Sequence, residues 1–257
     1  MGVSIPEGAK MVLLQEDRFK TYYNNLKHAL REYHQLVRSI VPVMKALLQP
    51  HVQAVEQRLR PGWTVLTWTS MNIDGYRKSV QEGLHRLQQV IAKANDIVDN
   101  RIVKNLKDIT RAVLVDMPKD RTVTLDDFVT MQEFNVRTVT DQLVEKNKEV
   151  EMAVEDLISV TVDRQAGATP ETMTPAIDEL RRHYNGLMYR AILSCTKTSL
   201  NVIKQRVCSK VRTGNRMRKS NAFFELDVQL SVPSVRLSPG LDDIQRSINA
   251  AAKSVLG

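Results

Sequence analysis

Apolar side chains recur along most of the chain at the spacing of one helix face, and this pattern predicts long amphipathic helices. The first stripe predicts a single helix that runs through Leu13, Phe19, Tyr22, Leu26, Leu30, Tyr33, Val37 and Ile40. Pro42 and Pro50 each lack a backbone donor, so we expect them to kink or split this helix, while the apolar stripe continues to Leu59.

Turn-forming and β-branched residues interrupt the helical pattern at residues 60–70, a segment that also holds both tryptophans, Trp63 and Trp68. We expect the helix to stop there and the two rings to be buried at the corner, where they would set the packing angle. A second helix, capped by Ser70 or Asn72, is predicted over residues 73–113. Its length would be roughly 60 Å.

Two more helices follow. After a connector at residues 116–120, Thr124 and Asp127 resemble a capping pair at the start of a third helix, which we expect to end near Val162. The turn-rich residues 166–170 separate it from a fourth helix, whose stripe begins at Ile177 and which should fray near residues 213–215.

From Phe224 the apolar residues alternate with a period of two, which predicts two extended segments on either side of Pro233. Ser238 and Pro239 are expected to be the N-cap and first residue of a last helix that begins its stripe at Leu241. The predicted fold is therefore mainly α, an elongated bundle of long antiparallel helices with a short extended or β segment near 223–237. We divide the chain into a helical bundle, residues 1–220, and an extended arm with the start of a further helix, residues 221–257. We also expect the sequence to be a fragment of a longer chain.

Composition is that of a soluble protein, with 42% apolar and 26% charged residues among 257. We expect no membrane span, since no run of about 18 uncharged apolar residues occurs. Without a secretory signal, the expected location is the cytoplasm. Cys195 and Cys208 would lie about 20 Å apart along one helix, so buried reduced thiols are expected rather than a disulfide between them.

The net charge of +8 is concentrated in one stretch of the chain. Eleven basic residues and no acidic one lie between Leu180 and Phe224; removing these eleven from the 37 basic residues leaves 26, against 29 acidic. An acidic helix precedes this stretch, so antiparallel packing of the two would balance much of the charge within the chain. The alternative is a contact with an acidic partner, through Lys204, Arg206, Lys210, Arg212, Arg216, Arg218 and Lys219.

Several enzyme classes lack their sequence signatures. No Gly-Lys pair occurs for a P-loop, no Gly-x-Gly for a dinucleotide turn and no Gly-x-Ser-x-Gly for a hydrolase. The closest histidines, His28 and His34, lie on different helix faces, which disfavours a zinc site. We therefore expect no catalysis, cofactor or metal.

The interrupted segment Leu59–Tyr76 carries a motif, a Pro-Gly followed by Leu-x-Trp-x-Ser-x-Asn-Ile-x-x-Tyr. This motif resembles a signature in the stem, or tail, of dynein heavy chains (N-terminal region 1), most closely those of axonemal dyneins. It comprises Pro61, Gly62, Trp63, Leu66, Trp68, Ser70, Asn72, Ile73 and Tyr76. A later segment, from Phe223 onward, is similar to the family's extended motif through Pro233, Ser238, Pro239 and Leu241.

The resemblance implies a rod of stacked helical bundles in which heavy chains contact each other and bind intermediate and light chains. It also implies that the stem attaches the motor to its cargo, which in the axoneme of cilia and flagella is the doublet microtubule, through docking proteins or tubulin. The motor ring, its nucleotide loops, the stalk and the linker have no counterpart here, so the motor ATPase is not implied. The alternatives are a spectrin- or vinculin-like adaptor, which lacks support from a fixed repeat, and a basic nucleic-acid binder, which lacks interleaved aromatic residues.

Overall fold

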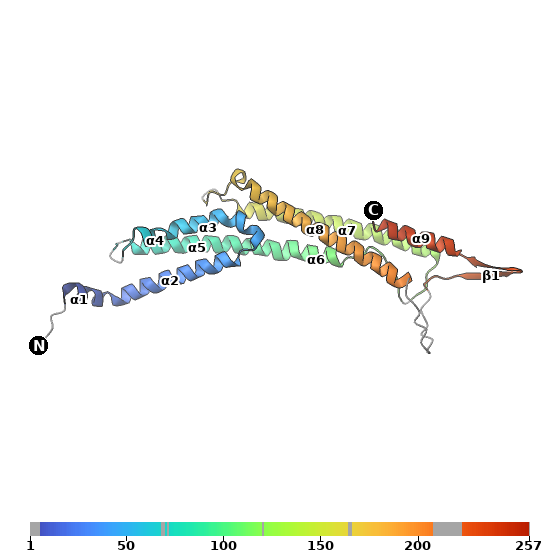
Figure 1. Ribbon diagram of the computed structural model, residues 1–257, viewed down its shortest axis with the longest axis horizontal. Helices are drawn as coiled ribbons and strands as arrows, with labels where there is room; N and C mark the ends of the chain where they lie inside the picture. Colours follow the sequence, from blue (N-terminus) through green and yellow to red (C-terminus); the bar gives the residue numbers. More distant parts are fainter. Residues whose placement is uncertain are drawn as a thin grey trace, which may run out of the picture. The chain divides into compact units, whose positions relative to one another are not determined.

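The computed structural model describes residues 6–67, 70, 72–119, 121–163, 166–207 and 223–256, which form two compact units. Unit 1 draws on Met1–Asn100 and Ala153–His183, and unit 2 on Arg101–Met152 and Tyr184–Gly257. The predicted mainly α fold is confirmed, because helices dominate and the described residues add only one two-stranded sheet (Figure 1). Among these residues, no helix is long and apolar enough to cross a membrane.

Unit 1 starts with α1 (Glu7–Leu14) and α2 (Glu16–Ser39), which the sequence predicted as one helix. A short 3-10 helix, η1 (Pro42–Met44), then leads into α3 (Lys45–Leu59). Pro42 therefore separates two helices as expected. Pro50 lies inside α3 and does not split it, because α3 buries its apolar face on both sides of the proline and this packing outweighs the missing hydrogen bond. The other expectation for Pro50, a kink, stays a prediction.

A short helix, α4 (Pro61–Thr64), follows α3 directly, and the helical run then ends within residues 60–70, where the sequence predicted that it would stop. Pro61 is its first residue, a position where the absent N–H costs nothing. After the described residues Val65–Thr67, α5 (Ile73–Asp96) begins and continues through a π-helical segment, η2 (Ile97–Val103), into α6 (Lys104–Arg111). The predicted helix over 73–113 is thus confirmed nearly in full.

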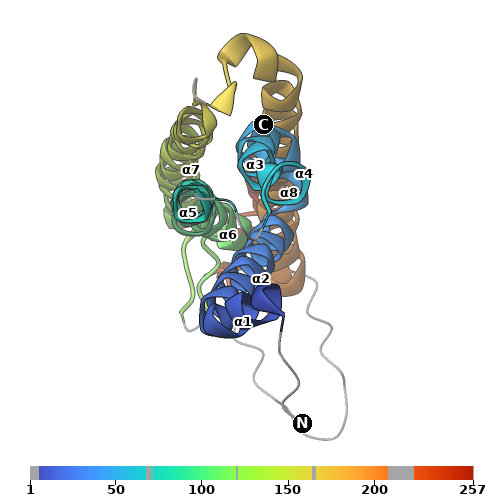
Figure 2. The same ribbon diagram turned by 90° about the vertical axis from the view of Figure 1, so that its left-hand side faces the viewer.

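The core of unit 1 lies where α3 packs against α5, and α2 packs on α5 from another side (Figures 1 and 2). Its fully buried side chains come at the predicted helical spacing and include Leu47, Leu48, Leu59, Leu84 and Leu87. No residue of α2 is buried, although α2 carries a long apolar stripe. Part of that stripe therefore remains accessible on the surface of unit 1.

The third and fourth predicted helices are α7 (Leu125–Thr161) and α8 (Pro170–Val207). The predicted cap of α7 is confirmed, since the Thr124 hydroxyl accepts the Asp127 N–H at 3.2 Å and donates to the Asp127 carboxylate at 2.8 Å. Within unit 1 the Arg181 guanidinium of α8 contacts both carboxylate oxygens of Glu155 of α7. This pair is one instance of the charge balance expected between the acidic and basic helices.

The core of unit 2 gathers the connector after α6, the first turn of α7, the second half of α8 and α9 (Leu241–Ser254). Its buried members include Leu114, Phe128, Cys195, Ile203 and Ala251. Cys195 is a free thiol as predicted, and burial raises its pKa. Cys208 lies outside the described residues.

The predicted extended segments form an antiparallel hairpin, β1 (Asp227–Ser231) and β2 (Ser234–Ser238), in which Leu230 pairs with Val235. The expected helix cap at Ser238 and Pro239 is wrong, because Ser238 is paired with Asp227 as the last residue of β2 and α9 begins only at Leu241. The predicted domain boundary near residue 220 lies outside the described residues and stays a prediction.

Candidate functional site

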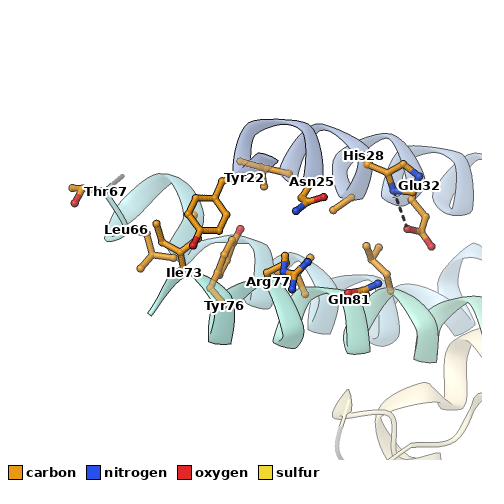
Figure 3. A pocket seen from close by; sticks show the side chains of 15 residues that line it. Tyr22, Asn25, His28, Glu32, Leu66, Thr67, Ile73, Tyr76, Arg77 and Gln81 are labelled. Atoms are coloured by element: carbon orange, nitrogen blue, oxygen red, sulfur yellow. Dashed lines mark ion pairs between the residues drawn. The ribbon is translucent and has the colours of Figure 1, made fainter. Parts of the chain in front are cut away.

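A surface pocket of about 280 Å³ opens in unit 1 between α2, the α4 corner and α5 (Figure 3). Its lining is mainly apolar, and four of the nine residues of the Pro-Gly motif line it: Gly62, Leu66, Ile73 and Tyr76. The remaining lining comes mostly from α2 and the middle of α5, and includes Tyr22, Leu26, Ala29, Val80 and Leu84. The sequence motif thus includes four of the lining residues, but nothing in it predicted a pocket.

Gly62 and Tyr76 fit together at the bottom of the corner. The Tyr76 hydroxyl donates to the carbonyl oxygen of Leu59 at 3.0 Å, and burial raises the pKa of this hydroxyl. A Cβ at position 62 would overlap the Tyr76 hydroxyl and lie 2.8 Å from its Cζ. Glycine is therefore required at position 62 for the Tyr76 ring to reach the end of α3.

The opposite wall of the pocket is the ring of Tyr22, which points across it toward Tyr76 (Figure 3). The Arg18 guanidinium donates to the Tyr22 hydroxyl at 2.9 Å and lies 5.4 Å from the centre of its ring, and this hydrogen bond raises the pKa of Arg18. On the polar rim, His28 and Glu32 lie one helix turn apart with a 3.8 Å contact. The pocket can therefore hold an apolar side chain between two aromatic rings, with polar groups at its edge.

Two further contacts tie the helices that form the pocket. The Tyr33 hydroxyl of α2 donates to Glu56 of α3 at 2.6 Å. The pKa of Tyr33 is raised to about 12, mainly by partial burial and secondly by this hydrogen bond to a carboxylate. Arg58 of α3 donates to the carbonyl oxygen of Ser79 in α5 at 3.0 Å. These bonds fix α2 and α5 relative to α3, so the pocket has a defined shape.

Trp63 is the clearest correction to the predicted corner. Its ring is 65% exposed, and the neighbouring Val65 is exposed as well, so the expectation of a buried tryptophan is wrong. Tyr76 and Leu66 occupy the corner instead, and the Trp63 ring is left at the surface. Trp68 lies outside the described residues.

The predicted caps of α5 are only partly correct. Asn72 is the N-cap residue of α5, but its side chain makes no capping hydrogen bond. Ser70 instead uses its hydroxyl to accept the Thr67 N–H at 2.9 Å, which closes the turn before the helix. The corner is thus held by the turn and by Tyr76 rather than by a cap.

The later motif lies in unit 2, where Phe223 and Phe224 pack edge-to-face on Phe128 of α7. Backbone bonds join Val123 to Phe223 and to Glu225, at 2.9 and 3.0 Å. Pro233 lies in the turn of the hairpin, and Val228, Leu230 and Val235 are exposed, with Leu230 at 83%, whereas Leu237 is half-buried. The motif therefore anchors the hairpin at one end and leaves its apolar residues at the surface.

Only the start of the predicted basic surface falls on described residues. Lys204 is exposed, whereas the Arg206 guanidinium lies 4.9 Å from the centre of the Phe223 ring. Arg206 therefore takes part in packing within the chain. The other candidates, Lys210, Arg212, Arg216, Arg218 and Lys219, lie outside the described residues, so the proposed basic contact stays a prediction.

Comparisons with known proteins identify relatives along nearly the whole chain. A family model described as dynein heavy chain, N-terminal region 1, matches residues 1–76. The dynein gamma chain of the flagellar outer arm of Chlamydomonas reinhardtii is 41% identical over 250 residues, which cover 96% of this chain and 6% of that protein. Dynein axonemal heavy chain 8 of Mus musculus is 26% identical over 97% of this chain and 6% of its own length. The chain thus spans only a small part of these relatives.

Proposed function

Because the chain belongs to the dynein heavy-chain family, as a segment of the N-terminal tail region, we propose that it is a non-catalytic assembly element of an axonemal dynein tail. Through it, heavy chains would pack together, intermediate and light chains would attach, and the arm would be held on the doublet microtubule of the cilium or flagellum. The observation that carries this proposal is the continuous similarity to an outer-arm heavy chain over 96% of the chain. That similarity favours the dynein tail over a spectrin- or vinculin-like adaptor.

The distribution of apolar side chains supports a role in assembly. Soluble proteins seldom expose clustered large apolar residues unless a partner covers them. Here Trp63 and Val65 are exposed next to the pocket, and Val228, Leu230 and Val235 are exposed together on one face of the hairpin. An isolated two-stranded hairpin is marginally stable in water, so a partner that covers its apolar face would also stabilise it.

Other heavy-chain segments, intermediate and light chains, docking proteins and tubulin are the partners that this role implies. A surface for such partners needs shape and apolar contacts rather than reactive groups. The pocket provides this, since its lining is mainly aromatic and aliphatic and also includes polar side chains, among them Asn25 and Arg77 (Figure 3). An apolar anchor from a partner, flanked by polar contacts, is the arrangement typical of the centre of a protein interface.

The test uses the complete heavy chain in ciliated cells. We expect a chain with Trp63→Ser and Val65→Ser to fold but to reach the axoneme in reduced amounts, with fewer co-purifying subunits. A matched control replaces two exposed polar residues of α3, Gln53→Ser and Gln57→Ser, and should assemble normally. Dynein occupancy on the doublets is counted by cryo-electron tomography. Wild-type occupancy by a heavy chain that lacks residues 6–256 would show that the proposal is wrong.

A further inference from the structure

The pocket of unit 1 has two chemically different halves along the groove between α2 and α5. At the α4 corner, Leu66 and Ile73 lie together with the rings of Tyr22 and Tyr76, so this half is apolar and aromatic (Figure 3). The volume of about 280 Å³ lies just below the ~300 Å³ at which small-molecule pockets begin. The pocket therefore admits one large residue rather than a whole helix, which is about 10–12 Å across.

The other half of the pocket presents hydrogen-bond donors. Asn25 of α2 and Arg77 of α5 line it and point toward each other, and Gln81 lies one helix turn beyond Arg77 (Figure 3). Among the residues that the structure describes, the side chains of Asn25 and Gln81 make no hydrogen bond. The Arg77 guanidinium approaches only Asp74, at 4.0 Å, and its side chain is exposed. A guanidinium and two amides can together donate to a group with two acceptor oxygens, which a carboxylate provides.

The acidic residue of the pocket lies away from these donors. Glu32 follows Asn25 by seven residues, which is roughly 10 Å farther along α2, and its carboxylate is 3.8 Å from His28. Tyr22, in contrast, precedes Asn25 by only three residues, a rise of about 4.5 Å. The carboxylate of a free aromatic amino acid lies roughly 5 Å from the centre of its own ring by standard bond lengths. A single C-terminal residue therefore matches the distance between the aromatic half and the donor half.

We propose that the pocket binds the C-terminal residue of a partner protein, with a large apolar side chain between the two tyrosine rings and its α-carboxylate on Arg77 and Asn25. Only a chain terminus carries an apolar side chain and a carboxylate on the same residue, and terminal carboxylates are a recurring target of peptide recognition. The inference rests on the assembly role proposed above and names the part of the partner that enters the pocket.

The test measures the binding of fluorescein-labelled peptides to the 257-residue chain by fluorescence anisotropy. The probe is a flexible Gly-Ser peptide that ends in phenylalanine with a free carboxylate, and its counterpart is the same peptide with a C-terminal amide. We expect the acid to bind about tenfold more tightly than the amide, because the amide loses the charge-assisted hydrogen bonds. Arg77→Gln should reduce this difference to within about twofold, whereas Tyr22→Ala should weaken both peptides by about tenfold.

The matched control is Lys78→Gln, which removes the neighbouring positive charge of α5 outside the pocket and should leave both affinities within about twofold of the wild type. An equal loss of acid binding in Lys78→Gln and Arg77→Gln would overturn the proposal, because the attraction would then come from the general charge of α5. Circular dichroism of each variant separates lost binding from lost folding.

Three other outcomes would also overturn it. They are equal binding of acid and amide, no binding of the acid at about 1 mM, and tighter binding of an amidated peptide with an internal Phe-Glu pair, which would show that the pocket takes an internal segment. Occupancy on the doublets is measured separately on the complete heavy chain, so the assembly role and this contact can fail independently.

Discussion

Replacement of Gly62 by alanine tests whether the α4 corner is built around Tyr76. The added Cβ would lie 2.8 Å from Tyr76 Cζ and would overlap its hydroxyl, so the ring must move away from the end of α3. The new Cβ is fixed to the backbone of α4, and the Tyr76 ring that it meets is half-buried. The whole ring must therefore move to relieve the overlap. The hydrogen bond from Tyr76 to the Leu59 carbonyl is then lost.

The magnitude follows from three contributions to the free energy of unfolding. Loss of the hydrogen bond costs about 1 kcal/mol, and forced repacking of the ring costs about 1–3 kcal/mol. The higher helix propensity of alanine returns up to about 1 kcal/mol, because position 62 lies in α4. We therefore expect Gly62→Ala to lower the free energy of unfolding by about 1–3 kcal/mol, measured by urea denaturation with circular dichroism.

The control is Gly186→Ala in α8, where an added Cβ meets nothing within 4 Å. This variant should gain about 0.5–1 kcal/mol from helix propensity alone. Removal of the Tyr76 hydroxyl by Tyr76→Phe should reduce the cost of Gly62→Ala, because the overlapping oxygen is gone. Equal stability of the two alanine variants would refute the assignment of Gly62 to a packing constraint.

Three further predictions concern other contacts. His51→Ala should lower the free energy of unfolding by about 1–3 kcal/mol in urea, because the buried His51 Nε2 donates to the Thr161 carbonyl at 2.7 Å and that acceptor would be left unpaired. The phenol of Tyr33 should titrate near 12 by absorbance at 295 nm, and its contribution to stability should be present below pH 10 and lost as the pH rises from 10 to 12, since its folded pKa is the higher one; Tyr33→Phe should abolish this loss. Trp63→Ala should change the free energy of unfolding by less than about 0.5 kcal/mol, because the ring is 65% exposed.

The course of the helices could be predicted because apolar spacing reports which side chains share a face. The stripe from Ile73 predicted nearly the whole run of α5, η2 and α6, and the capping pair Thr124 and Asp127 placed the start of α7. The position of Trp63 could not be predicted. The residue type predicts burial of a tryptophan, but its actual exposure depends on which side chains fill the corner in the folded chain. Here Tyr76 of α5 fills it, and its contact with the end of α3 links segments that no local pattern relates.

The pocket could not be predicted for a related reason. Its residues were identified as a motif, yet the space between them exists only because α2 approaches α5 with the Tyr22 ring facing Tyr76. No local pattern in α2 distinguishes Tyr22 from the other aromatic residues of the stripe. Packing between helices that are distant in sequence decides which residue lines a pocket and which is covered.

Three polar residues interrupt the apolar stripes, and they explain how the connectors are held. His51 follows Leu47 by four residues, Gln132 follows Phe128 by four, and Ser199 follows Cys195 by four, and all three are buried. Each satisfies a backbone group that has left regular helix, where the usual partners are missing.

Ser199 accepts the Leu114 N–H at 2.9 Å, Gln132 bonds both the N–H and the carbonyl of Asp116, and His51 bonds the carbonyl at the end of α7. At these three positions, a polar residue that continues an apolar stripe fastens a connector or a helix end to that helix, whereas the buried Asn105 donates to the Arg101 carbonyl of its own helix. In unit 2, such bonds tie the connector between α6 and α7 to both α7 and α8, because Gln132 and Ser199 each hold one of its residues.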